Sequence, residues 1–249
     1  MVESSRKVII ALPAYNEEPN LPDLLGRMDT ALREMHIQYQ VLIVDDGSTD
    51  RTYDIAAEWA DKVPVSVRRH EENQGLGATL RDGLEWARDV AAPNDVIVTM
   101  DADNSHTPEL IVRMIRMVRE GHDVVVASRF QPGSRVRGVP LSRRVLSRLG
   151  SWLFKVTFPI KGIKDYTCGY RAYKAGVLQD ALASDPEFFD QDGFQVMVDV
   201  LIKLRKRRDL IFGEVPLILR YDLKEGESKM DVGATITKTL SLMVHRRFR

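Results

Sequence analysis

Short apolar runs and longer stretches of helical length alternate through the first half of the chain. The runs are apolar at nearly every position and rich in β-branched residues, which favours strands covered on both faces of a parallel sheet. Regular alternation of this kind predicts an α/β domain with a mostly parallel, doubly wound sheet, right-handed crossovers and helices on both faces. The predicted strands are 8–12, 41–44, 63–67, 96–100 and 124–127, and the predicted helices are about 18–35, 50–61, 76–91 and 107–120.

The second half of the chain has a different pattern. Residues 131–140 are rich in Pro, Gly and Arg and are predicted to form a loop. Helices are predicted over 141–158 and 192–208, and a strand over 210–219. Because no repeat or obvious linker separates the two halves, we expect a single domain over residues 1–249.

Composition and charge narrow the class of protein. The 249 residues include 36 Lys and Arg and 36 Asp and Glu, so the balanced charge predicts no nucleic-acid binding. Residues 124–164 contain no acidic residue, which predicts one positively charged face. A single cysteine, Cys168, fits a reducing compartment. Neither a signal peptide nor a membrane-spanning run of about 18 apolar residues is present, which predicts a cytoplasmic protein.

Polar sequences follow three of the predicted strands. They are residues 13–17 (PAYNE), 45–48 (DDGS) and 101–103 (DAD). Ligands of open α/β sheets bind beyond the carboxyl ends of the strands. If the strands are parallel, the three sequences share one edge, which predicts a binding site there.

Asp101 and Asp103 are the strongest candidates for metal ligands. Residues two apart in an extended chain point the same way, and two adjacent carboxylates favour a bound cation or a proton. Hard oxygen ligands select Mg²⁺ or Mn²⁺, and Mg²⁺ is commonly held by one or two carboxylates together with substrate phosphates. The alternative is a turn and helix entry at Asp103; the position at the end of a strong strand favours the metal.

Other strand ends offer contacts for a nucleotide. Asp45 or Asp46 can accept hydrogen bonds from a base or ribose, although DDG is also typical of a tight turn. Tyr15 offers a ring for stacking and Glu17 an acceptor for ribose hydroxyls, although PAYNE also fits a helix start. Arg129 ends the strand 124–127, where a guanidinium can bind phosphate. The chain has neither a P-loop nor a complete G-x-G-x-x-G sequence after a strand.

Seven segments together resemble a known family: ALPAYNEEPNL, VLIVDDGSTDRT, NQGLGATLRDGL, VTMDADNSHTPE, VVASRF, DYTCGYRAY and GESKM. Their order, from about residue 7 to 231, is similar to that of inverting family-2 glycosyltransferases with the GT-A fold. Among these the chain looks most like polyprenol-phosphate and dolichol-phosphate mannosyltransferases. The resemblance implies a nucleotide-binding half (about 7–130), an acceptor-side half (about 131–231) and a basic C-terminal tail (232–249).

The resemblance also implies roles for individual residues. The nucleotide would be bound by Pro13, Tyr15, Glu17, Asp45, Asp46 and Asp101; the metal, Mg²⁺ or Mn²⁺, by Asp101, Asp103 and Ser105; the catalytic residues would be Asp103, Arg129 and Lys229; and the acceptor side would include Asp165, Arg171 and Gln195. Three positions depart from the family. Ser105 stands where relatives often carry Gln, Met197 where many carry an acid, and Leu223 where some carry Arg.

The expected reaction transfers a sugar, most simply mannose from GDP-mannose, to a polyprenyl monophosphate with inversion. A phosphate nucleophile is largely ionised at neutral pH, since its second pKa is about 6, so Met197 in place of an acid is tolerable. Alternatives with the same fold are a UDP-sugar donor or a saccharide acceptor. A saccharide hydroxyl would require a base, for which Asp190 and Asp192 are candidates. A nucleotidyltransferase is disfavoured because the N-terminal segment lacks a glycine-rich basic loop.

Helix 141–158 is the candidate membrane contact, because a polyprenyl acceptor lies in a bilayer. The helix can instead pack on the protein's own core, but the acid-free region around it favours an anionic membrane surface at the cytoplasmic face. Its apolar stripe is Leu141, Val145, Leu149, Trp152 and Val156, and the basic residues beside it are Arg144, Arg148 and Lys155.

Overall fold

The computed structural model describes residues 6–185, 187–191, 193, 195–223 and 232–247. In chain order the elements are β1 (Val8–Ala14), α1 (Leu21–Glu34), β2 (Tyr39–Asp45), α2 (Thr52–Ala60), β3 (Val65–Arg69), α3 (Leu76–Val90), β4 (Val96–Thr99), α4 (Leu110–Arg119), β5 (Val124–Ser128), β6 (Arg135–Arg137), α5 (Leu141–Thr157), β7 (Arg171–Lys174), α6 (Ala175–Ser184), α7 (Gln195–Arg205), β8 (Phe212–Pro216), β9 (Ile218–Arg220), the 3₁₀ turn η1 (Tyr221–Leu223) and α8 (Val232–Arg247).

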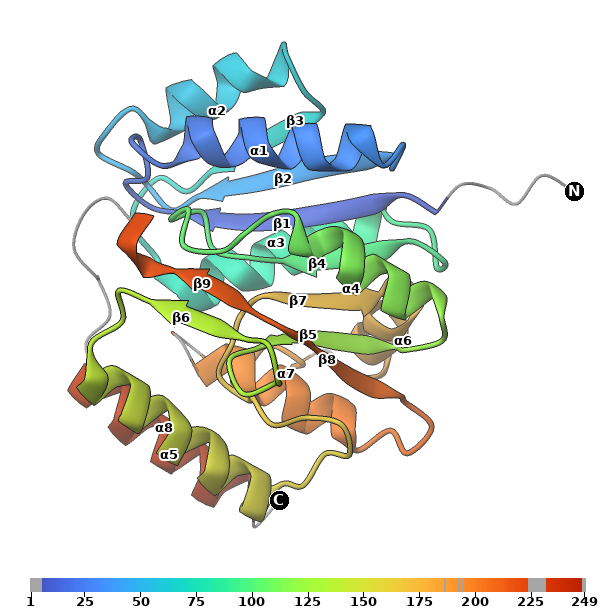
Figure 1. Cartoon of the computed structure of the whole chain (residues 1–249), viewed down its shortest axis with the longest axis vertical. Coiled ribbons are helices and arrows are strands. Elements are labelled where there is room, and N and C mark those ends of the chain that lie inside the picture. Colours follow the sequence, from blue (N-terminus) through green and yellow to red (C-terminus); the bar gives the residue numbers. More distant parts are fainter. Residues whose placement is uncertain (1–5, 186, 192, 194, 224–231, 248–249) are drawn as a thin grey trace, which may run out of the picture.

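The central sheet of the described chain has seven strands in the order β3-β2-β1-β4-β7-β5-β8. Neighbouring strands are parallel except at β7, which runs antiparallel to both β4 and β5. Helices α1 and α4 lie on the near face of the sheet in Figure 1, and α3 and α6 lie behind it. The predicted mostly parallel α/β fold, with helices on both faces, is therefore confirmed.

The strands form where the sequence is apolar on consecutive residues, because both faces of the sheet are covered. Every residue of β4 and β5 is buried, and so is every residue of β1 except Pro13. The helices that cover these strands have one apolar stripe each, as α4 shows with Ile111, Met114, Ile115 and Val118. The core is thus a continuous layer on each side of β1, β4 and β5.

Two predictions in the second half need correction. The predicted strand 210–219 is two strands, because the chain leaves the central sheet at Leu217. The amide of Leu217 donates to Ser128 in β5, while its carbonyl accepts from Arg135 in β6. Strand β9 then pairs with β6, so part of the predicted loop 131–140 is a strand.

Strand β7 and helices α6 and α8 were not predicted as elements. The segment assigned as a basic tail contains α8, which lies alongside α5 at the lower edge of the molecule in Figure 1. None of the helices in the described part of the chain combines the length and apolar composition needed to cross a bilayer.

The apolar stripe of α5 faces away from the core. Of its side chains only Ser151 and Phe154 are buried, and both lie outside the stripe. The alternative in which the stripe packs on the protein's own core is therefore wrong. The exposed fractions are 72% for Leu141, 56% for Val145, 58% for Leu149, 60% for Trp152 and 62% for Val156.

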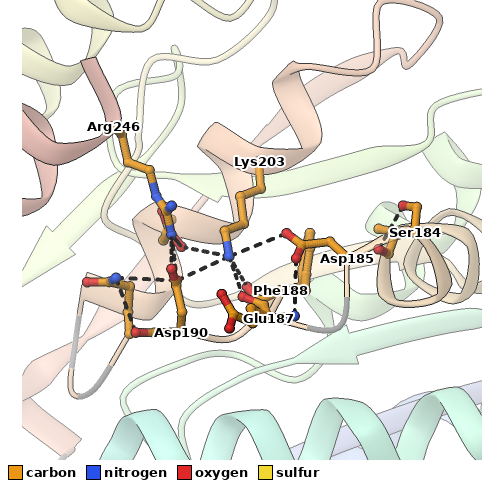
Figure 2. Close-up of polar contacts among 10 residues, drawn as sticks. Ser184, Asp185, Glu187, Phe188, Asp190, Lys203 and Arg246 are labelled. Carbon is orange, nitrogen blue, oxygen red and sulfur yellow. Dashed lines mark hydrogen bonds and ion pairs between the residues drawn. The ribbon is translucent and has the colours of Figure 1, made fainter. Parts of the chain in front are cut away.

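Buried charges fasten α8 to α7 and to the loop before it. Arg246 of α8 donates from Nε to Asp199 Oδ1 at 2.7 Å and from Nη2 to both Asp199 and Asp190. Lys203 of α7 donates to Asp190 and to the carbonyls of Glu187 and Phe188 (Figure 2). We call Asp190, Asp199, Lys203 and Arg246 the helix latch, since these side chains join α8 to α7 and to the loop that precedes α7.

Candidate active site

The three polar strand ends lie on one edge of the sheet. Asp45, the last residue of β2, pairs with Ala14, the last residue of β1, and the amide of Asp46 donates to the Ala14 carbonyl. On the other side of β1, Thr99 at the end of β4 pairs with Ala11. The prediction that the three sequences meet is confirmed, and we call this edge (residues 13–17, 45–48 and 101–105) the polar rim.

Hydrogen bonds between the first two strand ends fix the shape of the polar rim. Asn16 has a positive φ of 52°, its amide donates to Ser48 Oγ, and its side-chain oxygen accepts from the Thr49 amide. Glu17 is buried; its amide donates to Thr52 Oγ1, and its carboxylate accepts from Asn20. Tyr15, between these anchored segments, is half-buried.

Asp45 and Asp46 are both buried, and both hold protein donors. Asp45 Oδ1 accepts from the amide and the hydroxyl of Ser48, and Arg69 Nε lies 3.2 Å from its Oδ2. Asp46 accepts from the amides of Gln74 and Gly75, each at 2.9 Å. In this arrangement Asp46 shapes the rim by holding the loop after β3.

Asp101 and Asp103 differ in exposure. The Asp101 side chain is 39% exposed, whereas Asp103 is 8% exposed and accepts from the Ser105 amide at 3.1 Å and hydroxyl at 2.6 Å. Asn104, which follows Asp103, has a φ of 57°, and its side chain contacts Asp23 and Arg27 of α1. The loop that carries both carboxylates is thus held from its own turn and from the neighbouring helix.

The donor set fits a metal held jointly by protein and substrate. No cluster of three or more His, Cys, Asp or Glu side chains suited to a metal occurs in the part of the chain that the structure describes. Two carboxylates at a partly exposed edge are too few for a closed protein cage. They suit a Mg²⁺ or Mn²⁺ ion that keeps positions for phosphate oxygens and water. Ser105 supports Asp103 directly, since its hydroxyl donates to that carboxylate.

Arg129 is paired with Asp165 across the site. Its Nε and Nη2 donate to the two carboxylate oxygens at 2.8 and 2.6 Å, and Nη2 also donates to Thr167. Burial would raise the pKa of Asp165, but Arg129 holds that pKa below its usual value. Burial would likewise lower the pKa of Arg129, but Asp165, with a smaller contribution from Asp101, raises it. The guanidinium therefore places positive charge near Asp101 while most of its donors are occupied by protein.

Two predicted acceptor-side residues are buried. Arg171 is fully buried and donates to the backbone carbonyls of Tyr166, Cys168 and Met197. It therefore orders the segment before β7 against α7. Gln195, the first residue of α7, is 5% exposed.

Met197 occupies the position where an acid was expected from the resemblance. A Cβ built on Gly169 would lie 2.8 Å from Met197 Cε and 3.8 Å from Asp101 Oδ1. Gly169 therefore lets a thioether methyl and a rim carboxylate approach the same point. Next to Asp101, His106 accepts from the Asp101 amide at 3.4 Å and stacks on Tyr170.

The remaining candidates have different outcomes. Asp190 belongs to the helix latch; burial would raise its pKa, but the hydrogen bonds from Arg246 and Lys203 lower it, which makes it a poor base. Asp192 and Lys229 lie outside the described residues.

The contacts of Asn104 with α1 were not predicted, because they join residues more than 70 positions apart.

Comparison with solved structures identifies the fold class of the chain. It superposes on glucosyl-3-phosphoglycerate synthase from Mycobacterium tuberculosis with a TM-score of 0.67 at 19% identity, over 98% of this chain and 80% of that one. A mannosyltransferase from Pyrobaculum calidifontis, solved with GDP-Man and Mn²⁺, gives a TM-score of 0.57 at 18% identity, over 97% and 62%. The fold is that of GT-A glycosyltransferases.

Sequence comparison gives the family. The family model for glycosyl transferase family 2 matches residues 9–182, and the chain belongs to this family, which confirms the expected enzyme class. The dolichol-phosphate mannosyltransferase of Pyrococcus furiosus is 33% identical over 235 residues, which are 94% of this chain and 62% of that relative. The undecaprenyl-phosphate mannosyltransferase of Micrococcus luteus is 36% identical over 228 residues, 91% of this chain and 88% of that relative.

Proposed function

We propose that this chain transfers mannose from GDP-mannose to a polyprenyl monophosphate, with inversion and with Mg²⁺ or Mn²⁺, at the cytoplasmic face of a membrane. The observation that carries the proposal is the polar rim. The sequence identities of 33% and 36% to the two mannosyltransferases named above support it. One edge brings together the half-buried Tyr15 and the carboxylates Asp101 and Asp103, as a nucleoside diphosphate requires.

Asp101 and Asp103 would hold the metal, and Tyr15, Glu17, Asp45 and Asp46 the nucleoside. When bound, the metal supplies positive charge to the diphosphate leaving group. Asp103 is fixed by Ser105, so its carboxylate does not need to reorganise when a ligand arrives. Pro13 lies in β1 beside Val44 and supports the backbone that precedes Tyr15.

The acceptor side favours a nucleophile that is already ionised. Met197 has no proton acceptor, and the carboxylate of Asp190 is committed to Arg246 and Lys203. A phosphate oxygen with a second pKa of about 6 needs no strong base at neutral pH, whereas a sugar hydroxyl does. Arg129, and Lys229 from the segment after η1, would stabilise the phosphate charges electrostatically.

Helix α5 is the proposed membrane contact. Its five exposed apolar side chains lie next to exposed Arg144, Arg148 and Lys155, with no acidic residue in the helix. That combination suits an anionic headgroup layer, where each basic residue contributes about 1 kcal/mol. Val244 of α8, the helix that contacts α5, is exposed as well.

The direct test measures nucleotide binding and then transfer. Thermal shifts with GDP and UDP, each with and without divalent metal, identify the base; transfer to a short polyprenyl phosphate is then compared with transfer to a saccharide. We expect stabilisation by GDP with metal, and transfer only to the lipid phosphate. Stabilisation by UDP alone, or a preference for the saccharide, would refute the donor or the acceptor respectively.

Asp103→Ala tests the metal assignment, with Asp209→Ala as the control because Asp209 is exposed and far from the rim in sequence. We expect Asp103→Ala to lose at least about 100-fold in transfer rate while keeping a folded state, since charge stabilisation is commonly worth that much. Near-native turnover of Asp103→Ala would disprove the metal assignment. For α5, Trp152→Asp should weaken sedimentation with anionic vesicles, whereas Met35→Asp, at an exposed apolar site just after α1, should not.

A further inference from the structure

His70 lies between two carboxylates at the end of β3. Its Nδ1 is 2.8 Å from Asp46 Oδ1, and its Nε2 is 2.9 Å from Asp82 Oδ2 on α3. The imidazole is 10% exposed and Asp46 is 4% exposed, whereas Asp82 is 37% exposed. A neutral imidazole has one N–H and can donate to only one of these partners, whereas the imidazolium donates to both.

Charged side chains from three elements surround His70. Asp46 faces it from the end of β2 and Asp82 from α3, and the nearby cation on α3, Arg81, is paired with the other oxygen of Asp82. Arg69, the preceding residue, is directed to Asp45. Loss of the ring proton would leave the buried Asp46 with one N–H donor from a neutral ring, and Asp82, which is more exposed, would turn to solvent.

This bridge controls the position of a loop at the polar rim. Asp46, held by His70, accepts the amides of Gln74 and Gly75 and thereby fixes residues 70–75. The loop lies directly against the turn after β2: a Cβ on Gly47, whose φ is 67°, would be 2.6 Å from the backbone of Glu72. The orientation of the β2 turn and that of the loop therefore depend on the same carboxylate.

We propose that His70 is a positioning residue for the donor nucleotide, and that its imidazolium form holds Asp46 and loop 70–75 in the arrangement that binds the donor. This inference rests on the proposed function, because it places the nucleoside at the polar rim. Donor affinity is highest when the ring is protonated, and it falls as the pH rises and the bridge to α3 is lost.

Two amide substitutions separate the two halves of the bridge. The side-chain nitrogen of His70→Asn falls near the Nδ1 position and can donate to Asp46, whereas that of His70→Gln falls near the Nε2 position and can donate only to Asp82. Neither amide titrates. The binding constant for GDP or UDP with Mg²⁺ is measured by calorimetry from about pH 5.5 to about pH 9, the range in which histidines titrate. Thermal unfolding without nucleotide is recorded in parallel.

We expect His70→Gln to bind about 10-fold more weakly than the wild type at low pH, since it removes a hydrogen bond to a buried carboxylate. His70→Asn should be intermediate, and the advantage of the wild type over it should vanish as the pH rises. Titration of the nucleotide phosphate is common to all variants and cancels in this ratio. Asp82→Asn, at an exposed site, should move the loss of that advantage to lower pH.

The outcomes distinguish this inference from the function on which it rests. If the wild type binds neither nucleotide, the proposed function is wrong and the inference with it. If the wild type binds but the ratio to His70→Asn is constant with pH, or His70→Gln binds as tightly as the wild type, this inference alone is wrong. A lower melting temperature with unchanged nucleotide affinity would also overturn it, since that result shows a purely structural role.

Discussion

Replacing Arg246 with alanine tests how strongly the helix latch stabilises the protein. The substitution leaves two carboxylates without their main partner: Asp199, 2% exposed, and Asp190, 23% exposed. Breaking a buried ion pair by removing one partner costs about 3–5 kcal/mol. Two features reduce the cost here. Lys203 stays 3.1 Å from Asp190 and 3.7 Å from Asp199, and burial already raises the pKa of Asp199, so that it can take up a proton.

We therefore expect the free energy of unfolding of Arg246→Ala to fall by about 3 kcal/mol at pH 7, near the lower end of that range. For a chain of this size, that loss corresponds to a melting temperature about 6–12 °C lower. Arg247→Ala is the matched control, because Arg247 is the next residue of the same helix and is exposed; it should change stability by less than about 0.5 kcal/mol. Urea unfolding followed by circular dichroism measures both variants.

The pH dependence of the loss follows from the two carboxylates. Arg246 and Lys203 outweigh burial and lower the pKa of Asp190, so this group stabilises the wild type above its unfolded pKa, and the contribution is lost as the pH falls through the folded value. In the variant, Asp199 takes up a proton as the pH falls, which removes the cost of its unpaired buried charge. The difference between wild type and Arg246→Ala should thus begin to shrink below pH 7 as Asp199 takes up a proton, and should shrink further below about pH 4, where the contribution of Asp190 is lost. An equal loss in Arg246→Ala and Arg247→Ala, or a difference independent of pH, would refute the reasoning.

Three further predictions follow from buried or strained positions. Asp165→Asn should lower the free energy of unfolding by about 3 kcal/mol in urea titrations at pH 7, because Arg129 keeps its charge in a buried site; a loss below about 1 kcal/mol would contradict this. Gly47→Ala should destabilise more than Gly75→Ala by thermal melting, because both have positive φ but only the former meets neighbouring backbone, and equal losses would contradict this. Burial raises the pKa of Cys168 to about 12, so a thiol reagent should label it only after denaturation, and rapid labelling of the native protein would contradict this.

The parallel part of the fold could be predicted because its signal is local. Runs such as 8–12 and 96–100 are apolar on every or nearly every residue only because helices cover both faces of the sheet. Strand β7 gave no such signal. It is four residues long and begins with Arg171, whose charge is accommodated by two carbonyls of the preceding segment and by that of Met197 in α7. A strand defined by its neighbours, β4 and β5, cannot be found from its own residues.

In the candidate site, too, features with a local sequence signal could be predicted and contacts between distant residues could not. The carboxylates of the polar rim were predictable, because each follows a strand and parallel strands share an edge. Their partners were not. Arg129 pairs with Asp165, 36 residues away, and Asp46 binds a loop 28 residues away, so both predicted ligand-binding side chains also have partners within the protein. Distances along the chain carry no information on which polar groups compete for one carboxylate.

The reversed direction of β7 has a consequence for how such an enzyme can change its substrate. Because β7 starts where β4 ends, with Arg171 opposite Thr99, the segment that precedes it (158–170) reaches the polar rim from the side opposite to β1 and β2. Insertions or replacements in that segment can remodel one half of the site without shifting the strands that form the other half. We expect enzymes with this fold to change their acceptor by sequence changes in that segment, while the strands on the donor side keep their positions.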